Sequence, residues 1–308
     1  MVRARRLIGA VFAALLLFGC SEPTAEHQGN PDSLWSIERW KAEGASAVLI
    51  DVSRDAAYAE GHLPGAHQLW RTDIESTDYP YGGMAASREH LTALMDSLGV
   101  APGQQVVIYD GVGGCDAARL WWLLKLYGHP QVALLDGGAR AWTLGGDQLA
   151  VEPPAPGASA GFQFVGEPDA SLLAGVEDVQ HAAAQGVVLL DTRTDDEHTG
   201  RRMKSGAVRA GRIPQSLHYN WGNAVDLNGS GCMKSVADVK WDLTSAGVQF
   251  DAPIITYCHT GVRSAHTTFV LRELLGYENV ANYDGSWTEW SHLEELPIVA
   301  DQPVNPAL

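Results

Sequence analysis

Apolar residues occur along the chain in short runs that alternate with longer stretches of helical periodicity. Residues 106–109 and 254–257 are short runs rich in β-branched side chains, which are typical of strands buried on both faces. Residues 117–126 and 265–275 carry apolar side chains at helical spacing. The alternation of strand and helix predicts an α/β fold in which parallel sheets are flanked by helices on both faces.

The two halves of this pattern keep the same spacing. Asp110 follows the first of these strands, and Cys258 follows the second. Each is preceded by a glycine 11 residues earlier and followed by a glycine after 18 residues and an aspartate after 26 residues. These matching residues are Gly99, Gly128 and Asp136 in the first half and Gly247, Gly276 and Asp284 in the second. Three equal intervals predict a duplicated unit, with Asp110 in the place of Cys258.

The second copy is longer than the first in one place. A turn begins at Gly61, 10 residues after Asp51, in the first copy. The matching turn begins at Gly211, 20 residues after Asp191, in the second. The extra residues predict an insertion around 201–209.

A stretch with several prolines, residues 151–168, separates the two copies and is interpreted as a linker. We therefore expect a first domain at 34–150 and a second domain at 169–308. Both lengths are ordinary for single domains.

The amino-terminal residues are typical of an export signal. An apolar run of 13 residues, 7–19, follows three arginines. It is shorter than the about 17–25 residues that span a bilayer, but it suits a signal peptide. The run ends in Leu-Phe-Gly-Cys, which resembles the lipobox of bacterial lipoproteins; an ordinary cleaved signal is the alternative. We expect a signal peptide at 1–19, a lipid on Cys20, a polar tether at 20–33 and a location on the periplasmic side of a membrane.

The charge of the chain narrows the possible partners. The formal net charge is −16, and removal of Arg3, Arg5 and Arg6 with the signal would make it more negative. A chain this acidic is not expected to bind nucleic acid, or to bind a membrane except through a lipid anchor. We expect a monomer without a cofactor. The histidines and cysteines have no zinc-like spacing, so no metal site is predicted.

Chemistry is concentrated in the segment 258–264, Cys-His-Thr-Gly-Val-Arg-Ser, between a predicted strand and a predicted helix. Backbone N–H groups at a helix start have no intrahelical partner, and the helix dipole adds positive charge there. Such surroundings lower the pKa of a cysteine. Gly261 would let the backbone curl so that N–H groups point inward, and Arg263 adds a fixed charge. The segment predicts a reactive Cys258, with a buried, inert cysteine as the alternative.

The sequence resembles the two-domain rhodaneses, the thiosulfate and 3-mercaptopyruvate sulfurtransferases. The resemblance is carried by Gly-His-Leu-Pro-Gly at 61–65, Ala-Ala-Arg-Leu-Trp-Trp at 117–122, Leu-Asp-Gly-Gly at 135–138 and Tyr-Asp-Gly-Ser-Trp-Thr-Glu-Trp at 283–290. It implies two tandem rhodanese-like domains, of which the first is catalytically silent. It also implies that Cys258 carries sulfur as a persulfide, from a small-molecule donor to a thiol or cyanide. Substrate contacts are expected from the loop residues His259, Thr260, Gly261, Val262 and Arg263.

The details of the loop bear on the choice of donor. Mercaptopyruvate enzymes typically have Gly second and Thr sixth in this loop, where this chain has His259 and Arg263. A fixed charge suits thiosulfate, so thiosulfate is the predicted donor and 3-mercaptopyruvate the alternative. A substrate-binding arginine of the animal enzymes aligns with Glu197. Three arginines of the insertion are candidates to replace it: Arg201, Arg202 and Arg209.

Several residues keep two interpretations. Arg193 either contacts substrate or forms a structural ion pair with Asp191. Cys115 and Cys232 are interpreted as bystanders, with a resolving role for Cys232 as the alternative. Two other functions are less favoured. A cysteine-dependent phosphatase would have five residues between Cys and Arg, where this chain has four, and a non-catalytic binding lipoprotein would not need an intact Cys258 loop.

Overall fold

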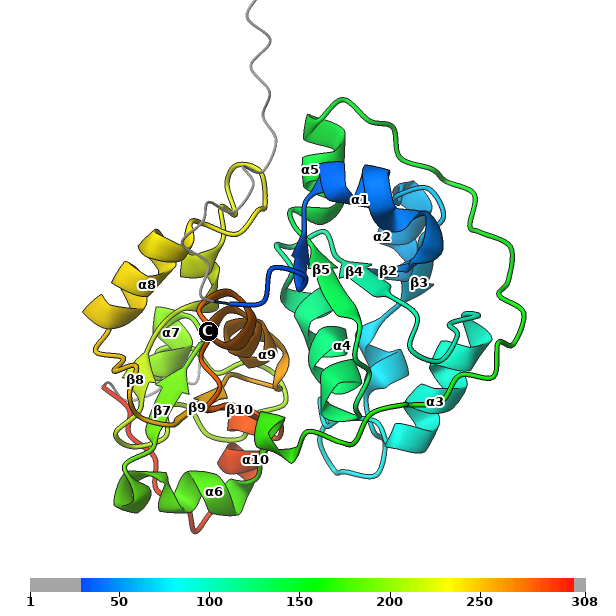
Figure 1. Cartoon of the computed structure of the whole chain (residues 1–308). Helices are drawn as coiled ribbons and strands as arrows, with labels where there is room; N and C mark the ends of the chain where they lie inside the picture. Colours follow the sequence, from blue (N-terminus) through cyan, green and yellow to red (C-terminus); the bar gives the residue numbers. More distant parts are fainter. Residues whose placement is uncertain (1–28, 302–308) are drawn as a thin grey trace, which may run out of the picture.

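The computed structural model describes residues 29–301 and shows two five-stranded parallel sheets with the same strand order (Figure 1). The first sheet has the order β1-β5-β4-β2-β3, and the second has β6-β10-β9-β7-β8. The strands of the first are β1 (Leu34–Trp35), β2 (Val48–Val52), β3 (His67–Leu69), β4 (Val106–Tyr109) and β5 (Val132–Leu135). Those of the second are β6 (Leu173–Ala174), β7 (Val188–Asp191), β8 (Leu217–His218), β9 (Ile254–Tyr257) and β10 (Val280–Tyr283).

Each sheet has helices on both faces. The first domain contains α1 (Ile37–Glu43), α2 (Asp55–Glu60), α3 (Arg88–Ser97), α4 (Cys115–Leu126) and α5 (Gly138–Leu144). The second contains α6 (Val176–His181), α7 (Asp195–His198), α8 (Val236–Ser245), α9 (Val262–Phe269) and α10 (Ser286–His292). The α9 helix continues into one π-helical turn, Val270–Leu274. The predicted α/β architecture of two tandem domains is confirmed.

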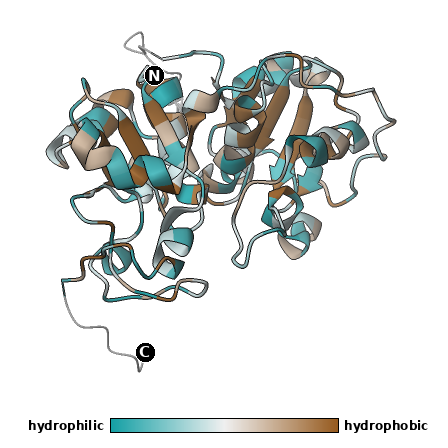
Figure 2. Ribbon diagram, turned by 90° about the horizontal axis from the view of Figure 1, so that it is seen from below, coloured by the Kyte–Doolittle hydropathy of each residue, from teal (hydrophilic) through white to brown (hydrophobic). Residues whose placement is uncertain are grey.

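The central strands form as their sequence predicts. All four residues of β4 and all four of β9 are buried, because both sheet faces are covered by helices. Figure 2 shows the strands as apolar bands between helices whose colours are mixed. Gly128 and Gly276, which follow the central helices, have φ angles of +90° and +73°. Glycine adopts this left-handed conformation at little cost, so it ends these helices well.

One apolar core is shared by the two domains. Helices α4 and α9 pack against each other between the sheets (Figure 1). Trp121 of α4 and Phe269 of α9 meet edge to face, with 5.0 Å between ring centroids. The buried cluster around them continues to Ile50 in the first sheet and Leu190 in the second. The outer faces of the two sheets have separate clusters, centred on Trp35 and on Trp287 and its neighbours.

The connection between the domains runs over the surface. Residues 151–169 contain no helix or strand and pass along the first domain to the short turn that begins at Ala170 (Figure 1). None of the helices within residues 29–301 is long and apolar enough to cross a membrane. The predicted signal peptide, Cys20 and most of the tether lie outside the described residues, as do the last residues of the second domain.

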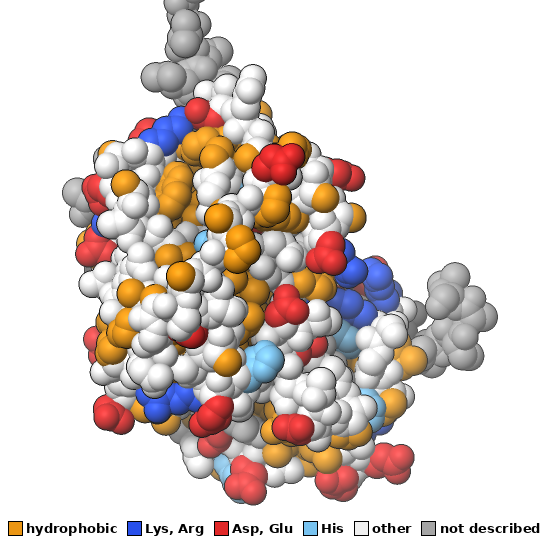
Figure 3. Space-filling view, turned by 90° about the vertical axis from the view of Figure 1, so that its right-hand side faces the viewer, with side chains coloured by type: hydrophobic (Ala, Val, Ile, Leu, Met, Phe, Trp, Pro, Cys, Tyr) orange, Lys and Arg blue, Asp and Glu red, His pale blue; other side chains and the backbone are white. Residues whose placement is uncertain are grey.

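Acidic side chains are dispersed over the surface. On the face shown in Figure 3 they lie singly among polar and apolar groups, and lysines and arginines form only small groups there. The negative net charge of the chain is therefore not concentrated on that face. Exposed charges of this kind are screened beyond about 8 Å at physiological salt.

Candidate active site

Cys258 is the first residue after β9, at the carboxyl edge of the second sheet. Its side chain is almost fully buried. The loop that follows turns at Gly261, which has a φ of +73°, and α9 begins at Val262. A Cβ at Gly261 would lie 2.8 Å from both Asp284 O and Arg119 Nη1. Both the backbone conformation and the close neighbours therefore require glycine here.

The surroundings of Cys258 favour its thiolate. Burial raises the pKa of the thiol, but the charge of Arg263 and the nearby polar groups of Ser264 and Thr260 lower it more. The net result is a pKa below the ordinary value for cysteine. Since the thiolate is the nucleophilic form, this supports the interpretation of Cys258 as reactive rather than inert.

The loop after β10 holds the Cys258 loop in place. The Ser286 hydroxyl accepts hydrogen bonds from Cys258 N at 3.1 Å and from Gly261 N at 3.0 Å, and donates to Tyr283 O at 2.7 Å. Trp287 N donates to Cys258 O at 3.0 Å. Ser286 has a φ of +51°, an uncommon conformation for a residue other than glycine. Nothing in the sequence alone assigns this role to Ser286, although the segment 283–290 carries part of the family resemblance.

The matching loop of the first domain shows what this geometry binds. The carboxylate of Asp110 accepts four backbone N–H groups at distances of 2.6 to 3.0 Å. These donors are Val112, Gly114, Asp116 and Ala117, which correspond in sequence to Thr260, Val262, Ser264 and Ala265 of the second domain. The loop is therefore an anion cradle, and in the first domain the protein's own carboxylate fills it.

Arg263 is part of the site, but both of its terminal Nη groups are bound by the carboxylate of Glu197. Its Nη1 lies 2.6 Å from Glu197 Oε2 and its Nη2 lies 2.8 Å from Glu197 Oε1. Burial raises the pKa of Glu197, but the hydrogen bonds and charge of Arg263 lower it to about 2. Glu197, in α7, also accepts a hydrogen bond from the hydroxyl of Thr194, the residue just before this helix. Glu197, which aligns with a substrate-binding arginine of the animal enzymes, thus orients Arg263.

Three other residues from which substrate contacts are expected also make contacts within the protein. His259 is buried, its Nε2 lies 2.9 Å from Ser205 O, and burial lowers its pKa to about 4. It is therefore neutral near pH 7 and anchors the insertion. The side chain of Val262 is buried. Thr260 faces the first domain: a Cβ added to Gly83 of that domain would lie 2.5 Å from the Cβ of Thr260.

A hollow of about 250 Å³ lies over the loop, between the two domains. His259 and Thr260 form part of its wall. Lys204 of the insertion lines it from the second domain, and Arg71 and Glu75 line it from the first. These three residues are not predictable from sequence, because nothing in their local pattern places them near the Cys258 loop.

The arginines proposed from sequence lie elsewhere. Arg193 is buried with its guanidinium against both oxygens of Asp191, at 2.9 and 2.6 Å, and stacks on Trp287. Arg209 donates to backbone carbonyls near the end of α10, including Trp290 O at 2.8 Å. Arg201 forms a surface pair with Asp196. The structure therefore gives Arg193 and Arg209 structural contacts and does not bring them to the hollow.

The other cysteines also differ from Cys258. Cys115 starts α4 and is buried, and burial together with the charges of Asp116 and Asp110 raises its pKa well above the ordinary value. It is poorly suited to act as a nucleophile. Cys232 is buried beside Gly137, since a Cβ added there would lie 2.7 Å from its Sγ.

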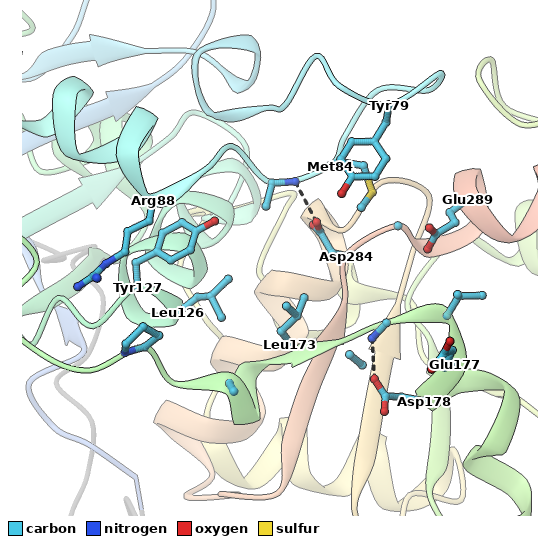
Figure 4. Close-up of a pocket in the computed structure, with 17 residues that line it drawn as sticks. Tyr79, Met84, Arg88, Leu126, Tyr127, Leu173, Glu177, Asp178, Asp284 and Glu289 are labelled. Atoms are coloured by element: carbon cyan, nitrogen blue, oxygen red, sulfur yellow. Dashed lines mark hydrogen bonds between the residues drawn. The ribbon is translucent and has the colours of Figure 1, made fainter.

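A second, larger groove of about 760 Å³ opens beside the site (Figure 4). Figure 4 shows Leu126 and Tyr127 from the first domain on one side and Leu173 from the second on the other. The first-domain segment near Met84 passes over it, and Ala85 N donates to Asp284 Oδ2 at 2.9 Å. The neighbouring residue Gly83 lines the hollow over the Cys258 loop.

Comparison with known proteins assigns the fold. A model of the rhodanese-like domain matches residues 36–144 and 176–293. The chain belongs to the rhodanese family. A Saccharopolyspora erythraea protein named "Putative thiosulfate sulfurtransferase" is 38% identical over 275 residues, covering 86% of this chain and 93% of that protein. A Mycobacterium tuberculosis protein named "Putative thiosulfate sulfurtransferase SseA" is 34% identical over 293 residues, covering 91% and 95%. These relatives support a sulfurtransferase activity.

Solved structures of similar fold are more distant in sequence. The anaerobic ergothioneine biosynthesis enzyme from Chlorobium limicola, in complex with trimethyl histidine, is 21% identical with a TM-score of 0.73. The wild-type structure of EanB is 20% identical with a TM-score of 0.72. The match covers 84% of this rhodanese and 65% or 64% of those chains, so this chain spans about two thirds of their length. At this identity the likeness concerns the fold.

Proposed function

We propose that this rhodanese moves a sulfane sulfur from thiosulfate to a thiol or cyanide through a persulfide on Cys258. The Cys258 thiolate attacks the outer sulfur of thiosulfate, a new S–S bond forms, and the old S–S bond breaks with its electron pair leaving on sulfite. The acceptor then attacks the outer sulfur of the persulfide and carries it away, for example as thiocyanate, which restores the thiolate. Covalent catalysis divides the transfer into two displacement steps.

The observation that carries this proposal is the pairing of a thiolate with an anion cradle. The first domain fills its cradle with the Asp110 carboxylate, held by four N–H groups. The second domain has Cys258 in that place, with a lowered pKa. A cradle of the same geometry would stabilise the negative charge of the thiolate and of the persulfide that replaces it.

The geometry favours sulfur transfer over phosphate hydrolysis. Four residues lie between Cys258 and Arg263, and both Nη groups of that arginine bind Glu197. A phosphatase would need both Nη groups of this arginine for bidentate hydrogen bonds to the phosphate. A non-catalytic binding function would not require the lowered pKa of Cys258.

The test of the function is a pair of measurements on the purified chain. Steady-state thiosulfate:cyanide transfer should give thiocyanate, and mass spectrometry after thiosulfate alone should show one added sulfur atom on the Cys258 peptide. 3-Mercaptopyruvate serves as the alternative donor with the same acceptor. Absence of the added sulfur with both donors would overturn the persulfide proposal, and a clear preference for 3-mercaptopyruvate would overturn the choice of thiosulfate.

The proposed setting is the periplasmic side of a bacterial membrane. Its support is the amino-terminal sequence, with a signal peptide at 1–19, a lipid on Cys20 and a tether at 20–33. We propose a monomer that acts on small molecules and meets the membrane only through this lipid. The proposed transfer requires neither a cofactor nor a metal, because Cys258 itself carries the sulfur.

A further inference from the structure

The Cys258 loop supplies little positive charge of its own to an anionic donor. Arg263 is held by Glu197 through two hydrogen bonds. The two residues after the nucleophile are His259, which burial keeps neutral near pH 7, and Thr260. Charge-assisted hydrogen bonds are the strong ones for a compact dianion. The cations that bind such a donor must therefore come from outside the loop.

Arg71 reaches the hollow from the silent domain. It begins the 3₁₀ turn Arg71–Ile74, just after β3 at the carboxyl edge of the first sheet. Its Nε donates to Asp116 Oδ1 at 2.6 Å, and its guanidinium lies 5.3 Å from the centre of the Trp70 ring. The side chain of Asp116 is 5% exposed, whereas that of Arg71 is 31% exposed. The buried Asp116 carboxylate thus fixes the guanidinium on its protein side, while Arg71 lines the hollow.

Lys204 lines the same hollow from the second domain. The insertion that carries it is anchored through the next residue, because Ser205 O lies 2.9 Å from His259 Nε2. Burial lowers the pKa of Lys204, and the charge of Cys258 opposes this change. Burial also lowers the pKa of Arg71, but Asp116, Cys115 and Cys258 together raise it above the ordinary value. Both cations are therefore within electrostatic reach of the nucleophile.

One carboxylate lines the hollow as well. Glu75 follows the turn that carries Arg71, and burial raises its pKa while the charges of Arg119 and Arg71 oppose this. Its charge would repel an anionic donor. The positive charge of Arg71 favours binding of an anion in the hollow, and the negative charge of Glu75 opposes it. Each charge can be removed by a single substitution.

We propose that Arg71 is a specificity-determining residue that the silent domain contributes to the active site. Together with Lys204 it binds the oxygen atoms of a small sulfur donor with two negative charges, while the outer sulfur of that donor meets Cys258. The nature of the donor rests on the proposed function; the placement of the positive charge does not. The silent domain is therefore a part of the substrate site as well as a support for it.

The first test measures local charge without reference to any sulfur donor. Rates of Cys258 alkylation by iodoacetate, an anion, and by iodoacetamide, which is neutral, are compared as a ratio, so that changes in thiolate content cancel. Arg71→Ala should lower this ratio by roughly tenfold, and Glu75→Gln should raise it. Arg54→Ala is the matched control, because Arg54 also stacks on Trp70 but does not line the hollow. A ratio that is unchanged in Arg71→Ala, or equally changed in Arg54→Ala, overturns the proposal.

The second test uses turnover. In Arg71→Ala, kcat/KM for thiosulfate should fall roughly 10- to 100-fold, mainly through KM, with partial rescue in Arg71→Lys. The rate of iodoacetamide alkylation should stay within about threefold of the wild type, which shows that the thiolate site is intact. An unchanged KM for thiosulfate would overturn the proposal. A wild-type chain that does not use thiosulfate, but loses its alkylation preference in Arg71→Ala, would leave Arg71 in its role and overturn the proposed donor.

Discussion

Arg119 and Asp284 form a buried ion pair across the two domains, with 2.5 Å between Nη2 and Oδ1. Their side chains are 1% and 8% exposed. The same guanidinium donates to Gly83 O at 2.7 Å and stacks on Trp122. Arg119 thus connects α4 of the first domain with the loop that follows β10, two residues before the Ser286 hydroxyl that holds the Cys258 loop.

This pair should be important for stability. Arg119→Ala leaves the Asp284 carboxylate buried without its cation, and we expect a loss of about 3–5 kcal/mol in the free energy of unfolding. Urea unfolding measures it. Arg201→Ala is the control, because its pair with Asp196 is exposed and should contribute at most about 1 kcal/mol. Equal stabilities for the two variants would contradict the prediction.

Cys258→Ser should abolish sulfur transfer and leave the fold intact. Serine has nearly the same volume, and a hydroxyl cannot form a persulfide. Thiosulfate:cyanide assay and circular dichroism measure the two parts. Cys115→Ser is the matched control: that thiol is also buried, but its raised pKa makes it a poor nucleophile, so activity should be kept. Substantial turnover by folded Cys258→Ser would show that another group carries the sulfur.

The reactivity of Cys258 should depend on pH with a midpoint below that of an ordinary thiol. Because the pKa is lowered, the alkylation rate rises with pH and levels off earlier. Arg263→Gln should raise the midpoint, since the charge that lowers the pKa is removed, while Arg272→Gln should not. The same shift links pH to folding. The stabilisation is full above the thiol's unfolded-state pKa and is lost as pH falls through the lowered value. A midpoint that does not move in Arg263→Gln would contradict the assigned cause.

A cysteine at the silent position should not create a second active site. In the double variant Asp110→Cys and Cys258→Ser we expect no sulfur transfer. Asp116 stands where Ser264 stands in the second domain, and Cys115 stands where Arg263 stands, so the new thiol would face a carboxylate and lack the adjacent arginine. Burial and the charge of Asp110 raise the pKa of Asp116 to about 6 in the native chain. Turnover by the double variant would contradict the expectation that the first domain is catalytically silent.

The proposed lipid anchor has a direct test. Cys20→Ala should move the chain from the membrane fraction to the soluble fraction, because a lipid on that residue is the proposed attachment. Fractionation with immunodetection measures the change, and mass spectrometry of the wild type shows whether the lipid is present. A wild-type chain that is soluble and carries no lipid would overturn the proposal.

The fold could be read from the sequence because its signals are local. The runs at 106–109 and 254–257 are the strands β4 and β9 of the structure, residue for residue. Equal spacing from Asp110 and Cys258 gave the duplication. The helix α4 starts at Cys115, two residues before the predicted start, because a helix start without a side-chain cap leaves little trace in the sequence. The π-helical turn after Phe269 was also not predicted, since the apolar spacing continues through it.

The site was only partly predictable, because half of it depends on contacts distant in sequence. Cys258, Gly261 and Arg263 lie together in one segment and were identified there. The sequence shows Glu197 where the animal enzymes have a substrate-binding arginine. Its pairing with Arg263 cannot be predicted, because that pairing depends on how α7 is oriented in the fold. Arg71 lines the hollow because it follows β3 at the interface between the domains. The periodicity of one copy does not show how the two copies pack, so this position could not be predicted.

The apolar core between α4 and α9 has a consequence for the duplicated chain as a whole. Trp121 and Phe269 come from different copies, yet each is buried by the other's neighbours. A half cut at the linker would expose this face to water and lose the residues that complete its site. The duplicated chain is therefore expected to persist only as a pair, because neither copy retains a complete surface of its own.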